Sequence, residues 1–202
     1  MNIKEFEGNW ENFENYFEGE DPNMIKAWKD SEQAIKNKKK NIIETLLYKD
    51  GVKSFWKKAC YTTTKENTYP LDHLMITTNN DQLIIEWFTI NHKSLGKYTY
   101  TLQSTIEKGL ERKPNDLFVS NIDSPFKYVL LMEPFPTKQE KTNLISHFHF
   151  QYASNKDDLI KHHKLVHKHW YATMCEGDVT MLDRCNIVLA LHKLPMWDTL
   201  PL

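Results

Sequence analysis

The sequence predicts an α+β fold, mainly β, in which helices lie before and after an antiparallel meander of strands. Three observations predict it: apolar residues at helical spacing over 1–60, period-two alternation with β-branched residues over 61–152, and a return to helical spacing over 153–202. The chain has 202 residues, no internal repeat, and no linker rich in Gly, Pro or Ser. One domain over 1–202 is therefore expected.

The composition narrows the class of protein before any motif is considered. Lys plus Arg number 26 and Asp plus Glu number 27, a net charge of −1, whereas a nucleic-acid-binding domain normally has a basic excess. With 40% hydrophobic residues the chain is too apolar for a disordered protein, yet no apolar run approaches the length of a membrane span. The charged N-terminus has no apolar stretch of signal-peptide type, so we expect a soluble cytoplasmic protein without nucleic-acid or membrane partners. Three cysteines, with no CxxC pair, are expected to be reduced and buried: Cys60, Cys175 and Cys185.

The first 60 residues predict three helices. After Gly8-Asn9, three aromatic residues at spacings of three and four would share one helical stripe: Trp10, Phe13 and Phe17. Asp21 followed by Pro22 is a typical helix start, with an Asp cap and a proline at the first helical position. Asp50-Gly51 leads into a short amphipathic helix that would turn Val52 toward the interior.

The middle of the chain predicts strands joined by tight turns. Asn79-Asn80-Asp81 and the polar residues 91–94 have the composition of hairpin turns. Seven short strands with close turns imply a meander that closes into a barrel or packs as a sandwich. The predicted strands span 61–64, 73–77, 82–88, 97–103, 116–121, 127–133 and 147–152.

Helical patterning returns after residue 155. The first of these helices is predicted from three apolar residues, Leu159, Ile160 and Leu165. A final helix is predicted over 181–194. Thr180 and Asp183 have the spacing of a capping box at its start, and Pro195 follows its end.

One histidine motif has the geometry of half a metal site. His147-Phe148-His149 lies in a predicted strand, where alternate residues share a face, so His147 and His149 point the same way. Two imidazoles on one strand face are the simplest pair of zinc ligands; the alternative is that both are polar residues on a solvated face. Glu133, at the end of the preceding strand, is the candidate third ligand, because zinc accepts two His and one carboxylate plus water.

The other histidines are expected to have structural roles. Five are isolated or lie on predicted helices without a ligand pattern: His73, His92, His162, His163 and His192. His167 and His169 form a second H-x-H motif, but near a helix end that spacing points the two rings apart. The sequence has no hydrolase nucleophile motif, no phosphate-binding glycine loop and no H-E-x-x-H motif.

Several short segments follow one another in an order that is found in a known family: Phe6-Glu7-Gly8-Asn9-Trp10, Asp21-Pro22, Lys97-Tyr98-Thr99-Tyr100, Ser146-His147-Phe148-His149-Phe150 and Trp170-Tyr171. This order resembles the ZinT-type zinc-binding family, whose members have a lipocalin-like (calycin) β-barrel with accessory helices. In that family three histidines bind zinc, two from the H-x-H strand and one from the end of the preceding strand. His147 and His149 match the first two, whereas Met132-Glu133 stands where the family has Asp-His. The resemblance implies a calycin barrel and a cytoplasmic relative with an altered site.

Two functions are predicted from these residues. The first is non-catalytic binding of zinc or another divalent ion by His147, His149 and Glu133. The alternative is lipocalin-like binding of a small organic molecule, with a vestigial metal site, in a barrel cavity lined by aromatic residues: Trp87, Phe88, Tyr98, Tyr100 and Phe118. An enzyme with an open metal site ranks below both, because no general base is evident apart from nearby acids.

Overall fold

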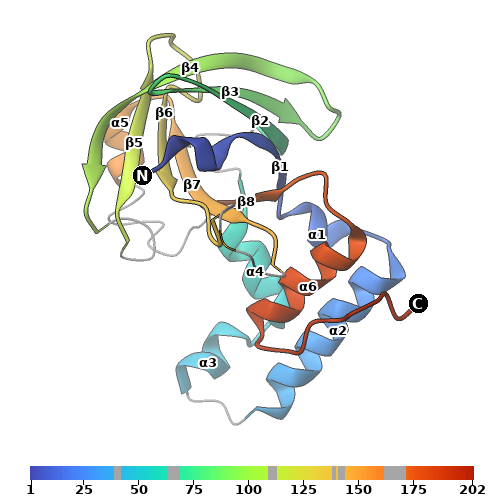
Figure 1. Ribbon diagram of the computed structural model, residues 1–202. Coiled ribbons are helices and arrows are strands. Elements are labelled where there is room, and N and C mark those ends of the chain that lie inside the picture. Colours follow the sequence, from blue (N-terminus) through green and yellow to red (C-terminus); the bar gives the residue numbers. More distant parts are fainter. Residues whose placement is uncertain (39–41, 63–68, 109–112, 138–139, 141–143, 162–171) are drawn as a thin grey trace.

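Eight antiparallel strands close into a barrel, and helices pack below it and along one side (Figure 1). The computed structural model describes residues 1–202 except 39–41, 63–68, 109–112, 138–139, 141–143 and 162–171. Strand order in the barrel follows the chain from β1 to β8, and β1 pairs with β8 to close it. The predicted fold class, a mainly β lipocalin-like barrel with N-terminal and C-terminal helices, is confirmed.

Six of the predicted strands correspond to β2 through β7. Alternation produced the prediction: in β3, Leu83, Ile85 and Trp87 are buried while the residues between them are partly exposed. The remaining predicted strand, 61–64, comes first along the chain. Residues 61 and 62 do not form a strand, and 63–64 lie outside the described residues. The strands are β1 (Gly8–Asn12), β2 (Leu71–Asn79), β3 (Gln82–Thr89), β4 (Ser94–Ile106), β5 (Asn115–Ser120), β6 (Tyr128–Met132), β7 (His147–Ala153) and β8 (Ala172–Glu176).

Two strands of the barrel, β1 and β8, lie outside the range 61–152 that was predicted to hold it. The prediction of one helical stripe through three aromatic residues is wrong at its start, because Trp10 enters the barrel core in β1. Phe13 and Phe17 instead pack among the helices, and the helix there, α1 (Asn15–Glu18), has only four residues. β1 pairs with β2 along one edge and with β8 along the other, and this pairing overrides the helix that the local spacing favours.

Side chains fill the interior of the barrel, and most of the large ones are aromatic. Trp87 stacks on Phe126 with ring centroids 4.3 Å apart, and its Nε1 donates to the Tyr100 hydroxyl at 3.2 Å. That hydroxyl donates in turn to the Phe126 carbonyl at 2.7 Å, and burial raises the pKa of Tyr100 far above its ordinary value. The largest fully buried members of this core are Phe6, Trp10, Trp87, Tyr100, Phe118, Phe126, Phe148, Phe150 and Tyr152.

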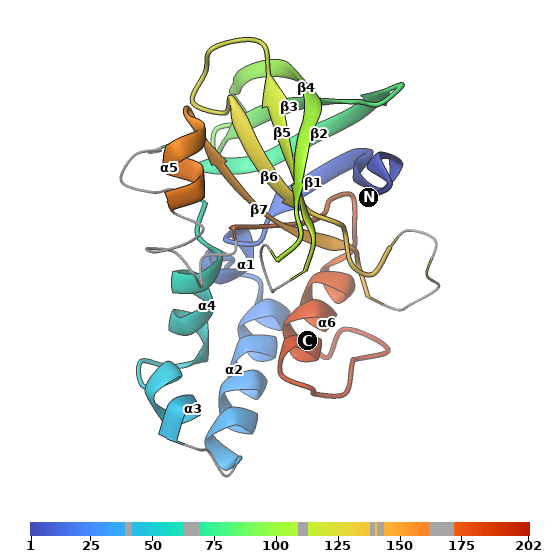
Figure 2. The same ribbon diagram turned by 90° about the vertical axis from the view of Figure 1, so that its left-hand side faces the viewer.

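The helices form a second layer with its own apolar core beneath one end of the barrel (Figure 2). α2 and α6 lie side by side, and α4 packs against α2. α5 lies apart from this layer, on the outer wall of the barrel at β6 and β7. The bounds are α2 (Pro22–Asn37), α3 (Ile42–Leu47), α4 (Val52–Cys60), α5 (Lys156–Lys161) and α6 (Met181–Leu191), with a short 3-10 helix at Ile3–Phe6.

Two of the predicted helix starts are confirmed by side-chain caps. Asp21 Oδ1 accepts from the backbone N–H of Asn23 at 2.8 Å, and Thr180 and Asp183 form a reciprocal capping box at α6. α5 contains the first part of the helix predicted after residue 155, while Leu165 lies outside the described residues. Among the helices of the described segments, none has the length and apolar content needed to cross a bilayer.

His192, directly after α6, ties two helices together through both of its ring nitrogens. Nδ1 lies 2.8 Å from the Val188 carbonyl oxygen, so we assign the proton to this nitrogen, and Nε2 then accepts from Trp56 Nε1 at 2.9 Å. The edge of the Trp28 ring lies beside the imidazole, with centroids 6.1 Å apart. Burial lowers the pKa of His192, and the Val188 carbonyl and Glu32 oppose this shift only in part.

This arrangement predicts that the protein loses stability in mild acid. The unfolded chain takes up a proton at His192 near the ordinary imidazole pKa of 6.5, whereas the folded protein resists protonation. The contribution of neutral His192 to the free energy of unfolding is therefore fully present above that pH. Below that pH the free energy of unfolding falls, with a slope of at most about 1.4 kcal/mol per pH unit. Urea denaturation between about pH 5 and 7.5 measures the slope, and His192→Phe should flatten it. An unchanged slope in that variant would assign the effect to other groups.

Candidate functional site

The two histidines of the H-x-H motif lie on the outer face of β7. Phe148, Phe150 and Tyr152 belong to the barrel core, so the alternate residues turn away from the interior. The ring centroids of His147 and His149 are 5.5 Å apart, with an angle of 72° between the planes. The prediction that both imidazoles share one strand face and lie within reach of each other is confirmed.

Neighbouring segments hold each of these imidazoles in place. His149 pairs with Thr173 of β8, and its Nδ1 lies 2.9 Å from the Thr173 hydroxyl oxygen in a buried position. His147 is half-buried; its backbone exchanges two hydrogen bonds with Phe135, at 2.8 Å and 3.1 Å, and the Phe135 ring meets the imidazole edge-on. A hydroxyl on one ring nitrogen fixes the orientation of the other, which is how proteins prepare a histidine to bind a metal.

Glu133 does not join the two histidines among the described residues. No group of three ligand atoms within 4.8 Å of one another in the described segments contains His147, His149 and Glu133. The pairing of β6 with β7 supplies the reason: Leu131 lies opposite Phe150, the next pair along is Phe135 with His147, and Glu133 lies in the unpaired stretch where the register shifts by one residue. The prediction that Glu133 is the third ligand is therefore not supported by the strand geometry.

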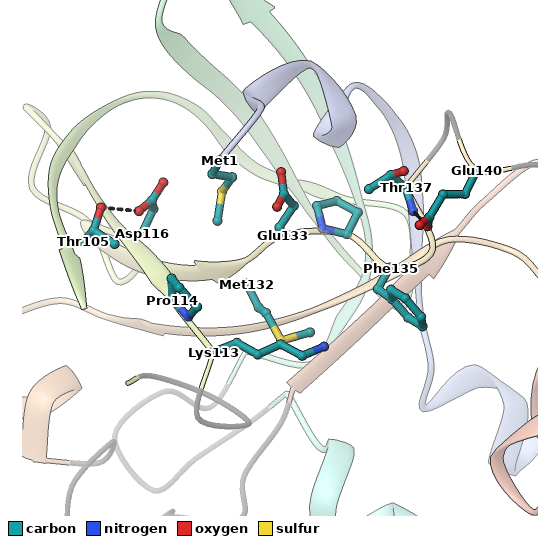
Figure 3. Close-up of a pocket in the computed structure, with 11 residues that line it drawn as sticks. Met1, Thr105, Lys113, Pro114, Asp116, Met132, Glu133, Phe135, Thr137 and Glu140 are labelled. Carbon is teal, nitrogen blue, oxygen red and sulfur yellow. Dashed lines mark hydrogen bonds between the residues drawn. The ribbon is translucent and has the colours of Figure 1, made fainter. Parts of the chain in front are cut away.

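Glu133 instead faces the N-terminus, on the rim of an open pocket at the end of the barrel. β6 ends one residue earlier, and the Glu133 carboxylate accepts from the backbone N–H of Asn2 at 3.0 Å. Figure 3 shows Glu133 beside Met1, whereas the Phe135 ring points away from it toward Lys113. The pocket has a volume of about 370 Å³, and its lining includes Met1, Lys113, Asp116, Met132, Glu133 and Phe135.

The aromatic residues predicted to line a ligand cavity have other roles. Trp87, Tyr100 and Phe118 are fully buried within the packed barrel core. Tyr98 is partly buried, and its hydroxyl donates to the Leu95 carbonyl at 3.1 Å. Phe88 lies outside that core and stacks on His73. These residues therefore do not line a ligand cavity, because three of them occupy the space that an internal ligand would take.

One cluster of possible ligands escaped the sequence interpretation. Within the described segments, the group of three His, Cys, Asp or Glu donors that lies close enough to hold a metal ion is Asp72, His73 and His92. In the sequence, His73 and His92 are isolated histidines without a ligand pattern. The available signal was their place in the predicted hairpin: His73 starts one strand, and His92 lies in the turn that ends its antiparallel neighbour. The histidines at 162, 163, 167 and 169 lie outside the described residues.

Comparisons with known proteins do not assign this chain to a family. No family model matches it, and neither the curated proteins nor the solved structures include a match. The relationship to the ZinT-type family stays a prediction from the sequence.

Proposed function

We propose that this protein binds a divalent metal ion, zinc in the first instance, without catalysing a reaction. The single observation that supports this function most is the pair of imidazoles on the outer face of β7, with centroids 5.5 Å apart. Imidazole nitrogen is a preferred zinc ligand, and two rings on alternate residues of one strand can converge on one ion. Thr173 holds Nδ1 of His149, so we assign metal binding by His149 to Nε2.

The remaining coordination positions belong to water or to further protein groups. Zinc in proteins usually has three or four protein ligands, so His147 and His149 alone form half a site. Glu133 does not come within ligand reach of both histidines in the described segments, and its carboxylate accepts from the Asn2 N–H instead. The next candidates by sequence are His167 and His169, the second H-x-H motif, and mutagenesis must decide between them. The proposal retains the cytoplasmic location expected from the sequence.

Isothermal titration of the metal-free protein with zinc tests this function. His149→Ala should weaken binding at this site by at least about 10-fold, and Thr173→Val by roughly 10-fold to 100-fold, because the hydroxyl orients the ligand. Glu133→Ala is the matched control and should bind as wild type does. Affinity should also fall below about pH 6, because only neutral imidazole binds the metal.

Two results of the titrations would overturn zinc binding by the β7 histidines, and a third would identify a further ligand. A wild-type protein that binds zinc no tighter than the micromolar range would overturn the proposal, as would a double variant, His147→Ala with His149→Ala, that keeps the full wild-type stoichiometry. If His167→Ala or His169→Ala weakens binding as much as His149→Ala does, that residue supplies the third ligand.

Binding of a small organic molecule has less support. Its predicted cavity is occupied by the side chains of Trp87, Tyr100 and Phe118. The pocket beside Glu133 is open at the barrel end, and Phe135 on its rim is 53% exposed, so a ligand there would remain largely in water. We therefore place this function second.

A further inference from the structure

We propose that Asp72, His73 and His92 form a second metal site, separate from the β7 histidines, for a divalent ion of zinc type. The site lies at the junction between the start of β2 and the turn that joins β3 to β4. It supplies two imidazoles and one carboxylate, a ligand set that zinc accepts with water in the remaining position.

A β-bulge brings two of the three ligands to the same face. The pairing of β2 with β3 shifts between Leu71 and His73, so Asp72 is the extra residue. Leu71 and Leu74 are both in the barrel core, and the two residues between them consequently both face outward. In a regular strand, Asp72 and His73 would lie on opposite faces and could not bind one ion.

The three donor atoms converge on one point. Oδ2 of Asp72 lies 2.6 Å from Nδ1 of His73 and 3.2 Å from Nδ1 of His92. All three atoms lie within 4.8 Å of one another, and the two ring centroids are 5.5 Å apart. A metal at this point would replace the proton in the hydrogen bond between Nδ1 of His73 and Oδ2 of Asp72, so its binding must compete with protonation.

Surrounding residues hold the donors before any metal arrives. The His73 ring stacks on Phe88, with centroids 4.2 Å apart and planes 11° apart. Oδ1 of Asp72 accepts from Asn15 Nδ2 at 3.0 Å, which leaves Oδ2 directed at the histidines. Such supporting contacts are typical of prepared metal sites and reduce the ordering that binding requires.

The third donor, His92, is exposed to solvent, so an ion can reach the site from its side. The side chain of His92 is 78% exposed, while those of His73 and Asp72 are 26% and 17% exposed. His92 has a left-handed backbone with φ of 55°, and its N–H donates to the Thr89 carbonyl at 2.8 Å, so the turn itself fixes where the imidazole starts. Two nitrogen donors out of three favour zinc and similar transition metals over magnesium or calcium, which prefer oxygen.

The test uses a background that lacks the first site. In the His147→Ala, His149→Ala double variant, zinc titration should reveal one remaining site. Adding His92→Asn or Asp72→Asn should weaken that site by at least about 10-fold, the range seen when contacts around a metal are lost. Asn tolerates the left-handed backbone at position 92, so this change removes the imidazole without straining the turn. Lys93→Ala, in the same turn, keeps all three donors and is the matched control.

Imidazole resonances in nuclear magnetic resonance spectra give a second, independent readout. Zinc added to the double variant should shift the resonances of both His73 and His92, and the shifts should saturate together. If only His92 responds, the ion binds a lone exposed histidine and the proposal is wrong; if neither responds, it is equally wrong. Either result leaves the β7 site untouched, because that site is measured separately in the His92→Asn protein with His147 and His149 intact.

Discussion

Replacing Trp87 by alanine should lower the free energy of unfolding by about 3–5 kcal/mol, the cost of removing a large aromatic side chain from a packed core. Trp87 is fully buried at the centre of the barrel, where it stacks on Phe126 and donates to Tyr100. For a chain of this length, such a loss corresponds to a drop in melting temperature of roughly 10 °C. Thermal and urea denaturation measure it, and Phe135→Ala, at a 53% exposed ring, is the control that should change little.

The same variant decides between a filled barrel and a ligand-binding barrel. Removing the indole leaves an apolar cavity, and such cavities stay dry and bind small aromatic molecules. Indole should therefore raise the melting temperature of the Trp87→Ala protein and leave the wild-type value unchanged. If indole stabilises the wild type to the same degree, the interior already holds room for a ligand, and the small-molecule function moves ahead of metal binding.

The second large effect is expected at the ion pair that joins β1 to α6. Nε and Nη2 of Arg184 donate to the two carboxylate oxygens of Glu11, both at 2.8 Å, and the Tyr16 hydroxyl donates to the same carboxylate at 2.6 Å. Burial, with contributions from Cys175 and Glu11, raises the pKa of Tyr16 well above its ordinary value, so its hydroxyl stays protonated. Glu11 is 15% exposed, and losing Arg184 would leave its charge without a cation.

Arg184→Met should therefore destabilise the fold by roughly 2–3 kcal/mol, less than a fully buried pair would lose because water still screens this one. A double-mutant cycle with Glu11→Gln isolates the coupling between the two side chains. Lys58→Met breaks an ion pair of similar length, 2.7 Å to Asp50, whose side chains are 68% and 49% exposed. That change should cost much less than the loss of Arg184, because water screens both of these exposed charges. Equal losses at the two pairs would show that burial does not govern their strength.

The strands and helix starts that the sequence predicted are those with a local signal. In β3, the period-two pattern of Leu83, Ile85 and Trp87, together with its β-branched residues, identifies the strand without reference to any partner. Caps such as Asp21 act within one turn of the chain. β1 and β8 have no comparable signal: each has five residues, and their place in the barrel depends on pairing with one another across almost the whole chain.

For the metal-binding candidates too, the sequence predicts what depends on local alternation and not what depends on the pairing of strands. That His147 and His149 share a face follows from alternation alone, and this part of the prediction is confirmed. The position of Glu133 depends on the register between β6 and β7, which the sequence does not determine. That Asp72 and His73 share a face depends on a bulge, which is set by how two strands pair and leaves no mark in the alternation of one strand.

Closure of the barrel through β1 and β8 has a consequence for how the protein folds. β1 is synthesised before the other seven strands, and its partner β8 is the last of the eight to be made. Until then the nascent sheet has two unpaired edges, one on β1 and one on β7, that can capture strands of other chains. Pairing between such distant segments is also intrinsically slow. We infer that the last pairing event both completes the fold and removes its main route to aggregation.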